Sequence, residues 1–145
     1  MKQATCQKVI NVTPPAAIID NTSALTTAID TIGFRYCQIL VSLGATDIAM
    51  TALKVQQSDT DGSYADVTGL VYGASGAAAL PIATSDNGVY VFNIDLRGKK
   101  RFLDVVATFG DGSVGGFVSI LALLFEGEDT PRSATERGFA AELTA

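Results

Sequence analysis

Short apolar runs, separated by clusters of turn-forming residues, make up most of this 145-residue chain. The runs are rich in Val, Ile, Leu and Phe, and within most of them apolar and polar side chains alternate. Alternation with a period of two is typical of a β-strand that buries one face. The pattern therefore predicts an all-β protein, with strands at 7–12, 34–43, 47–58, 64–70, 89–96, 101–109 and 117–125.

The alternation also predicts which side chains share a face of a strand. In the run 47–58, Leu53 and Val55 share one face, and Met50 and Lys54 share the other. The run 117–125 is apolar on both faces, so we expect it at the centre of a sheet. The other expected apolar faces are Cys37, Ile39, Val41 and Leu43, opposite Tyr36, Gln38 and Leu40; Tyr90, Phe92, Ile94 and Leu96; and Leu103, Val105, Ala107 and Phe109.

Turn-forming residues predict how the strands are connected. The cluster at 59–63 joins the strands on either side of it into a β-hairpin with an exposed polar tip. The segment 16–34 is expected to be extended and interrupted by turns, with a short strand near 24–29. Its threonines and the lack of a 3.6-residue period disfavour a helix there. The remaining connections are a turn at 44–47, a long loop at 71–88, a tight turn at 97–100, after which 101–109 returns, and a loop at 110–116.

A single domain accommodates all of these elements. Six to eight short strands with glycine-rich turns predict a jelly-roll-like β-sandwich, with a core at 34–125. The N-terminal strand and arm (1–33) and the C-terminal tail (126–145) carry few core-like residues. We expect these arms to contact a neighbouring copy; disorder in the free protein is the alternative. A short helix in the tail, with Phe139 and Leu143 four residues apart, would need to dock to be ordered.

Composition indicates a surface that is partly covered by other protein. Charged residues make up 17% of the chain, against about 25% in a typical globular domain. Self-association is the simplest way to cover the apolar second faces of the strands. The net charge of −5 argues against general nucleic-acid binding. No apolar run is long enough for a membrane span, and the N-terminus lacks an apolar signal core, so we expect assembly in a cytoplasm.

The chain lacks the residues that most catalytic and metal sites need. It contains no histidine and no tryptophan, and we expect no catalytic site, cofactor or metal. Cys6 and Cys37 have no metal-site spacing and are interpreted as buried reduced thiols, with a disulfide as the alternative. Asp95 and Asp104 flank the turn at 97–100. Ion pairs with its basic residues are favoured there over a catalytic carboxylate pair.

Two stretches resemble a known family. The segment 44–69, with LKVQQSDTDGS and DVTG, and the segment 94–113, with DLRGKKRFLDVVAT, are similar to small head-region proteins of tailed bacteriophages and prophages. The similarity extends over about 34–139, including PRSATERG. It implies a capsid decoration or cement protein on the virion surface, which binds the major capsid protein and itself, as a trimer or dimer. Open alternatives are a head–tail connector, a tail component, or a displayed receptor- or glycan-binding module.

The turn at 97–101 is the candidate docking site in this scheme. Four of the ten basic residues lie there, namely Arg97, Lys99, Lys100 and Arg101. One interpretation is a docking tip for an acidic surface of the shell or of a neighbouring copy, and such contacts are sensitive to salt. The other is a solvated turn whose charges prevent a strand edge from pairing.

Overall fold

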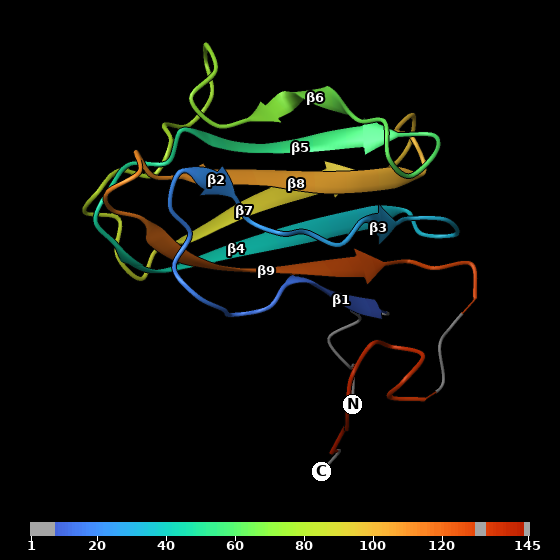
Figure 1. Ribbon diagram of the computed structural model, residues 1–145. Coiled ribbons are helices and arrows are strands. Elements are labelled where there is room, and N and C mark those ends of the chain that lie inside the picture. The colour runs from blue at the N-terminus through green and yellow to red at the C-terminus, as the bar shows by residue number, and fades with distance from the viewer. Residues whose placement is uncertain (1–7, 130–132, 144–145) are drawn as a thin grey trace.

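The computed structural model describes residues 8–129 and 133–143, which form two antiparallel sheets packed face to face (Figure 1). No helix is present within these residues. The four-stranded sheet has the order β1 (Lys8–Thr13), β9 (Gly116–Phe125), β4 (Tyr36–Thr46) and β7 (Val89–Asp95). The five-stranded sheet has the order β2 (Thr22–Ser23), β8 (Phe102–Phe109), β5 (Ala52–Ser58) and β6 (Ala65–Val71), and β3 (Ile29–Asp30) also pairs with β8. The predicted all-β sandwich is confirmed.

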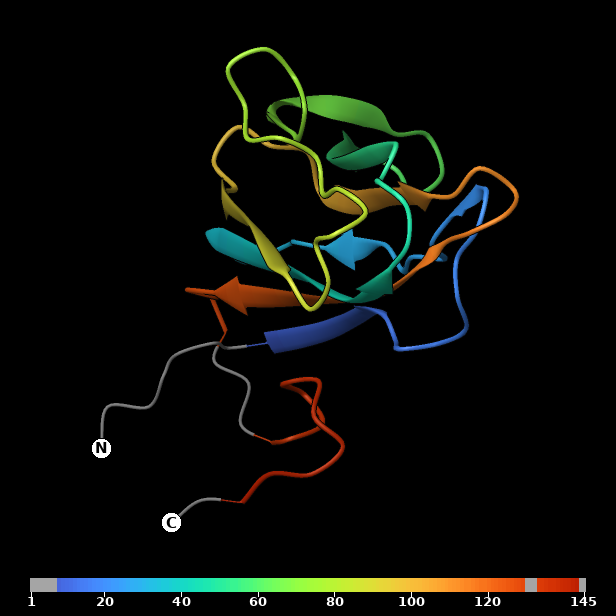
Figure 2. The same cartoon turned by 90° about the vertical axis from the view of Figure 1, so that its left-hand side faces the viewer.

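The strands pair as a nested set. β1 pairs with β9, β2 and β3 pair with β8, β4 pairs with β7, and β5 pairs with β6. Most connections therefore cross from one sheet to the other, as the edge-on view in Figure 2 shows. The predicted hairpin of β5 and β6, with its exposed tip at 59–63, is the exception among the longer strands.

The core lies between the two sheets and is filled by alternate side chains of each strand. The shared faces predicted for β4 and β8 are fully buried, and so are Leu53 and Val55 of β5. In β7 the predicted face is also inward, with Tyr90 partly buried at its start. β9 lies between β1 and β4, as its two apolar faces predicted. The predicted burial of Cys37 is confirmed, whereas Cys6 lies outside the described residues.

The predicted return of 101–109 against 89–96 is wrong. β7 belongs to the four-stranded sheet and β8 to the five-stranded sheet, so the turn between them is a crossover. The turn itself is tight, with the Lys99 amide donating to the Leu96 carbonyl at 3.0 Å and Gly98 at φ 74°. Alternation shows which side chains point inward but is the same for strands that pair and for strands that face each other across a core.

One further predicted connection and the predicted place of Met50 differ from the structure. The turn expected at 44–47 is absent, because β4 continues to Thr46 after a register shift that follows Leu43. Gly44 lies so close to Phe117 that a Cβ atom would be 3.0 Å from the Phe117 Cβ. The glycine thus permits close strand approach within a bulge instead of forming a turn. Met50 lies outside β5 and is buried in the core.

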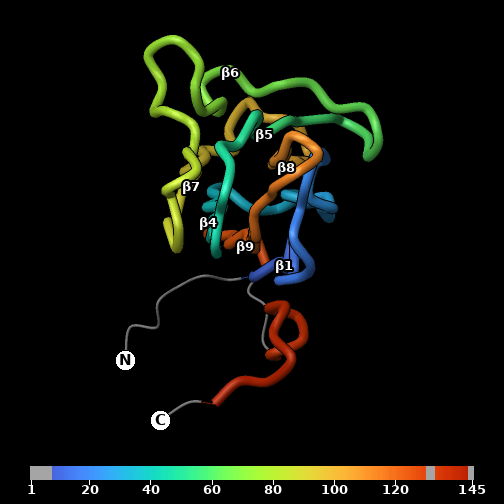
Figure 3. Tube along the Cα trace, turned by 60° about the vertical axis from the view of Figure 1, so that its left-hand side comes forward, coloured from blue at the N-terminus to red at the C-terminus, as the bar shows by residue number. Residues whose placement is uncertain are grey.

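The N-terminal segment is part of the sandwich, whereas the C-terminal tail contacts it at few points. Residues 8–33 contribute three strands and the buried side chains of Val12, Ala24 and Ile29. The tail forms a single turn at 133–138 instead of the predicted helix, because Gly138 at φ 83° ends it. This turn packs on the edge of β1, where the Val9 amide donates to the Arg137 carbonyl at 2.8 Å (Figure 3).

The described core predicts that truncating two leucines will change the free energy of unfolding by very different amounts. Leu103 of β8 is 0% exposed and Leu143 of the tail is fully exposed. We expect Leu103→Ala to lower the free energy of unfolding by about 2–5 kcal/mol, because it leaves a cavity between the sheets. Leu143→Ala should leave it unchanged. Chemical denaturation of both variants measures this difference, and equal effects would contradict the described core.

Candidate interaction surfaces

The outer face of the four-stranded sheet is apolar. Along β4, β7 and β9 the side chains that alternate with the buried ones point outward, and most are hydrophobic. The strand register aligns Leu40 with Leu121 on one side and with Val91 on the other, which makes a continuous row across three strands. We call the following set the apolar face: Tyr36, Leu40, Val89, Val91, Phe117, Leu121, Leu123 and Phe125.

Much of the apolar face is accessible, and it carries almost no charge. Val89 is 65% exposed and Phe117 is 41% exposed. The polar side chains that point outward from β4, β7 and β9 are uncharged, apart from Asp95 at the end of β7, which forms an ion pair with Arg97. Two shallow hollows of about 270 and 210 Å³ border the face, one at Tyr36 and Phe125 and one at Phe117. A relatively flat apolar surface of this kind is typical of a protein contact.

The outer face of the five-stranded sheet is built differently. Its polar side chains bond to one another across strands, as in the contact of 2.9 Å between Lys54 Nζ and Asp66. The Gln56 amide also donates to Asp66, at 2.7 Å, and the hydroxyls of Ser23 and Thr108 are 2.6 Å apart. This face is therefore suited to contact with water, and the two outer faces of the sandwich are not equivalent.

The basic turn at 97–101 is largely neutralised by carboxylates from other elements. Lys100 Nζ is 2.7 Å from Asp59 at the hairpin tip, and Arg97 pairs with Asp95 of β7. Arg101 forms a bidentate pair with Asp30 of β3, at 2.9 and 2.7 Å, and its guanidinium lies 4.8 Å from the centre of the Phe102 ring.

All four basic side chains are exposed, but only Lys99 makes no ion pair within 8–129 and 133–143. The ion pairs of the other three side chains connect the crossover turn to the ends of both sheets. The positive charge available to a partner is thus smaller than the sequence alone indicates.

The two aspartates that flank the turn have separate environments. The predicted ion pairing is confirmed for Asp95, where the hydrogen bond from Arg97 lowers the pKa of the carboxyl to about 2. Asp104 instead accepts a hydrogen bond of 2.6 Å from the Thr26 hydroxyl. Since β7 and β8 belong to different sheets, the two carboxyls do not form a pair across the turn.

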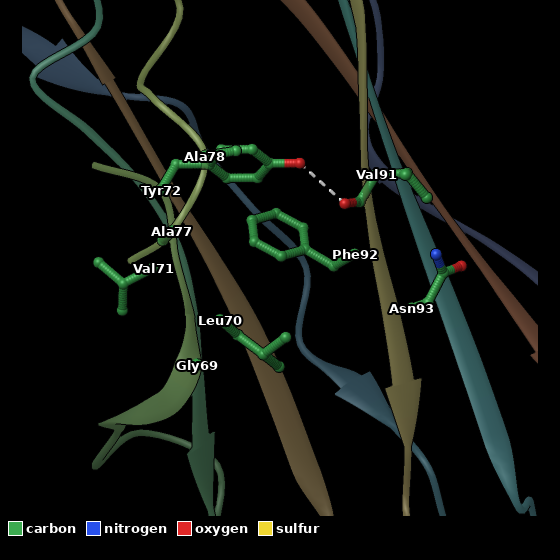
Figure 4. Close-up of a pocket in the computed structure, with 9 residues that line it drawn as sticks. All are labelled: Gly69, Leu70, Val71, Tyr72, Ala77, Ala78, Val91, Phe92 and Asn93. Carbon is green, nitrogen blue, oxygen red and sulfur yellow. Dashed lines mark hydrogen bonds between the residues drawn. The ribbon is translucent and has the colours of Figure 1, made fainter. Parts of the chain in front are cut away.

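A hollow of about 300 Å³ lies between the edge strands β6 and β7, which belong to different sheets (Figure 4). Its walls are mainly apolar, and the Tyr72 hydroxyl crosses it to donate to the Val91 carbonyl at 2.9 Å. The Tyr72 ring also makes edge-to-face contacts with Tyr90 and Phe92. Tyr72 lay in a predicted loop, and no sequence signal indicated that it bridges two sheet edges.

Within the described part of the chain, no group of three or more His, Cys, Asp or Glu side chains could hold a metal ion. None of its residues forms a helix long and apolar enough to span a membrane. The charged side chains described above are those of the ion pairs at the crossover turn and those on the outer face of the five-stranded sheet, such as Lys54 and Asp66.

Comparisons with known proteins assign no family to the chain. No protein-family model matches it, and no curated protein matches its sequence.

The pair of Asp30 and Arg101 predicts a pH-dependent contribution to stability. The hydrogen bond from Arg101 holds the pKa of Asp30 below its ordinary value of 3.8. A carboxyl with a lowered pKa stabilises the fold at pH values above its unfolded pKa, and this contribution is lost as the pH falls through the lowered value. We expect an NMR titration of Asp30 to show a midpoint below 3.8 in the wild type.

The variant Arg101→Gln should move this midpoint back toward 3.8. Arg97→Gln is the matched control, because it removes the partner of Asp95 and leaves the Asp30 pair intact. A wild-type midpoint at or above 3.8 would show that the ion pair does not form in solution.

Proposed function

We propose that this protein is a structural protein of a tailed-phage virion, which decorates and cements the assembled head from its outer surface. The observation that carries the proposal is the apolar face, an exposed sheet surface with one charged side chain at its end. Such a surface is costly to leave in water and gains free energy when a partner covers it. The resemblance of 44–69 and 94–113 to phage head proteins indicates the kind of partner.

We propose further that the sandwich is a jelly roll. If β2 and β3 are taken as one interrupted strand, the eight strands pair first with last, second with seventh, third with sixth and fourth with fifth. This nested order is the pairing scheme of a jelly roll. Jelly rolls recur in viral capsid proteins, as well as in lectins and cupins, and a capsid role is supported where this fold occurs together with the apolar face.

Decoration stabilises a shell by mass action. A protein that binds the assembled shell, and not the dispersed capsid subunits, lowers the free energy of the shell by its binding free energy at every occupied site. An icosahedral shell repeats the same site many times, so a modest contact is multiplied. The apolar face supplies such a contact with an apolar patch on the major capsid protein, and no cofactor or chemical step is required.

Copy number in the virion tests this role. Quantitative mass spectrometry of purified particles from a phage that encodes this chain should find hundreds of copies per particle. A dozen or fewer would instead indicate a head–tail connector or a tail component, and absence from the particle would exclude a virion role. A displayed receptor-binding module would be revealed by binding of the isolated domain to a glycan array.

The apolar face should contribute more to head binding than the basic turn. Leu121→Lys places a charge in the middle of the apolar row and should weaken binding to undecorated heads by about tenfold to a hundredfold. Thr68→Lys, on an exposed position of β6, is the control for the added charge and should bind normally. Co-sedimentation with purified heads measures both affinities.

A double variant of the basic turn distinguishes the contribution of this turn to head binding from that of the apolar face. Lys99→Glu with Lys100→Glu reverses both lysines, and because the turn is largely neutralised, we expect binding close to that of the wild type. If this variant fails to bind while Leu121→Lys binds normally, the docking site is the basic turn and not the apolar face.

A further inference from the structure

β7 is an edge strand whose outer side pairs with no other strand within the described residues. The amide of Leu43 donates to Gly88 at 2.9 Å, and that of Leu96 donates to Arg35 at 3.0 Å. These two bonds set the phase of the pairing between β4 and β7, in which every second residue of β7 bonds to β4. The backbone groups of Val89, Val91 and Asn93 therefore point away from the sheet.

Only one of these outward groups is occupied within the described residues. The Val91 carbonyl accepts the hydrogen bond from the Tyr72 hydroxyl, which confirms the phase of the pairing (Figure 4). The Val91 amide and both backbone groups of Asn93 make no hydrogen bond to any described residue. Unpaired amides and carbonyls along an edge are a template for another strand.

The β1 edge of the same sheet is covered. The tail turn at 133–138 lies against it, and the Val9 amide already donates to Arg137. Gly138 is so close to this edge that a Cβ atom would lie 1.9 Å from the Val9 carbonyl oxygen. The chain itself therefore blocks strand addition at β1.

The β6 edge of the opposite sheet is interrupted and charged. Its pairing with β5 shifts register between Lys54 and Gln56, and Gly69 has φ 85°. Asp66 adds a charge in the first half of the strand. Bulges and charges of this kind are the usual protection of an edge strand.

β7 has neither a bulge nor a charge in its middle, and within the described residues its outer side is bridged at Val91 alone, by the Tyr72 hydroxyl. It pairs with β4 over all seven of its residues without a register shift. Its one charged residue, Asp95, stands at its end and is paired with Arg97. A long, regular and almost uncharged edge is expected to pair with another strand.

We propose that β7 of one copy pairs in antiparallel orientation with β7 of a second copy, about a two-fold axis at Asn93. Two identical antiparallel strands are related by such an axis, so each copy offers the surface that the other needs. At this register the two Asn93 residues exchange backbone hydrogen bonds, and each Asp95 lies opposite Val91 of the second copy. The Val91 carbonyl then accepts from the Asp95 amide of the second copy in addition to the Tyr72 hydroxyl, since a carbonyl oxygen has two lone pairs. No like charges face each other, which favours a second copy of this acidic chain as the occupant.

The side chain of Asn93 suits this position. Its Oδ1 accepts a hydrogen bond of 2.8 Å from the Gln38 amide on the neighbouring strand. Its own amide group is left to donate across the axis to the second copy. The exposed Asn93 side chain thus joins the two sheets without adding charge.

The pairing joins two four-stranded sheets into one and places both apolar faces on the same side. This consequence rests on the proposed function, since two linked faces bind a shell more tightly than either face alone. The edge pairing itself rests only on the geometry of β7.

Solution mass tests the pairing. Sedimentation analysis of the full chain should give about twice the monomer mass of 15.1 kDa. Asn93→Pro removes the amide hydrogen that the second copy needs and leaves the backbone bonds to β4 in place, because edge strands tolerate proline. It also removes the side-chain bond from Gln38, which Asn93→Lys removes as well. Asn93→Lys sets two lysines opposite each other at the axis. Both variants should be monomers, whereas Thr68→Lys on the β6 edge should remain a dimer.

Thermal unfolding controls for folding of the variants, and Asn93→Lys serves if the proline variant does not fold. A monomeric wild type would overturn the inference, as would a dimer that survives both Asn93 variants or is lost in Leu121→Lys. A monomer that still coats heads would overturn the pairing and leave the proposed function intact. A dimer that is absent from virions would overturn the proposed function and leave the pairing intact.

Discussion

The structure depends on the burial of one face of each sheet against the other. Ile39, Val105 and Ile120 are examples of side chains with no more than 1% exposure in the resulting core. A two-layer sandwich can bury only one face of each strand, and β9 has two apolar faces. The second face of β9 is therefore left outside, where β4 and β7 extend it. The apolar face follows directly from this constraint.

Charge is used mainly to hold the sandwich together at its ends. The crossover between β7 and β8 carries four basic side chains, and carboxylates from β3, β7 and the β5–β6 hairpin pair with three of them. Exposed pairs of this type each contribute little free energy. Together they join the crossover to both sheets, which a loop of glycine and polar residues would not do. The same pairing leaves the uncharged surfaces as the better candidates for contact with other proteins.

The edges and faces of the molecule point to the same mode of assembly. One edge of the four-stranded sheet is covered by the chain's own tail, and the other presents unpaired backbone groups. The apolar face lies between these edges. In the proposed assembly, two copies join through their β7 edges and both apolar faces dock on the shell.

The sequence by itself determined the local features of this protein. Alternation identified the strands and the inward side chains, such as Leu103 and Phe109, because successive side chains of a strand point to opposite faces of its sheet. It could not show that 89–96 and 101–109 lie in opposite sheets, since the same alternation serves both arrangements. The bulge at Gly44, the tail turn on β1 and the bridge from Tyr72 to Val91 were decided by tertiary structure. Each depends on a contact between residues far apart in the chain, and such contacts leave no periodic signal in the sequence.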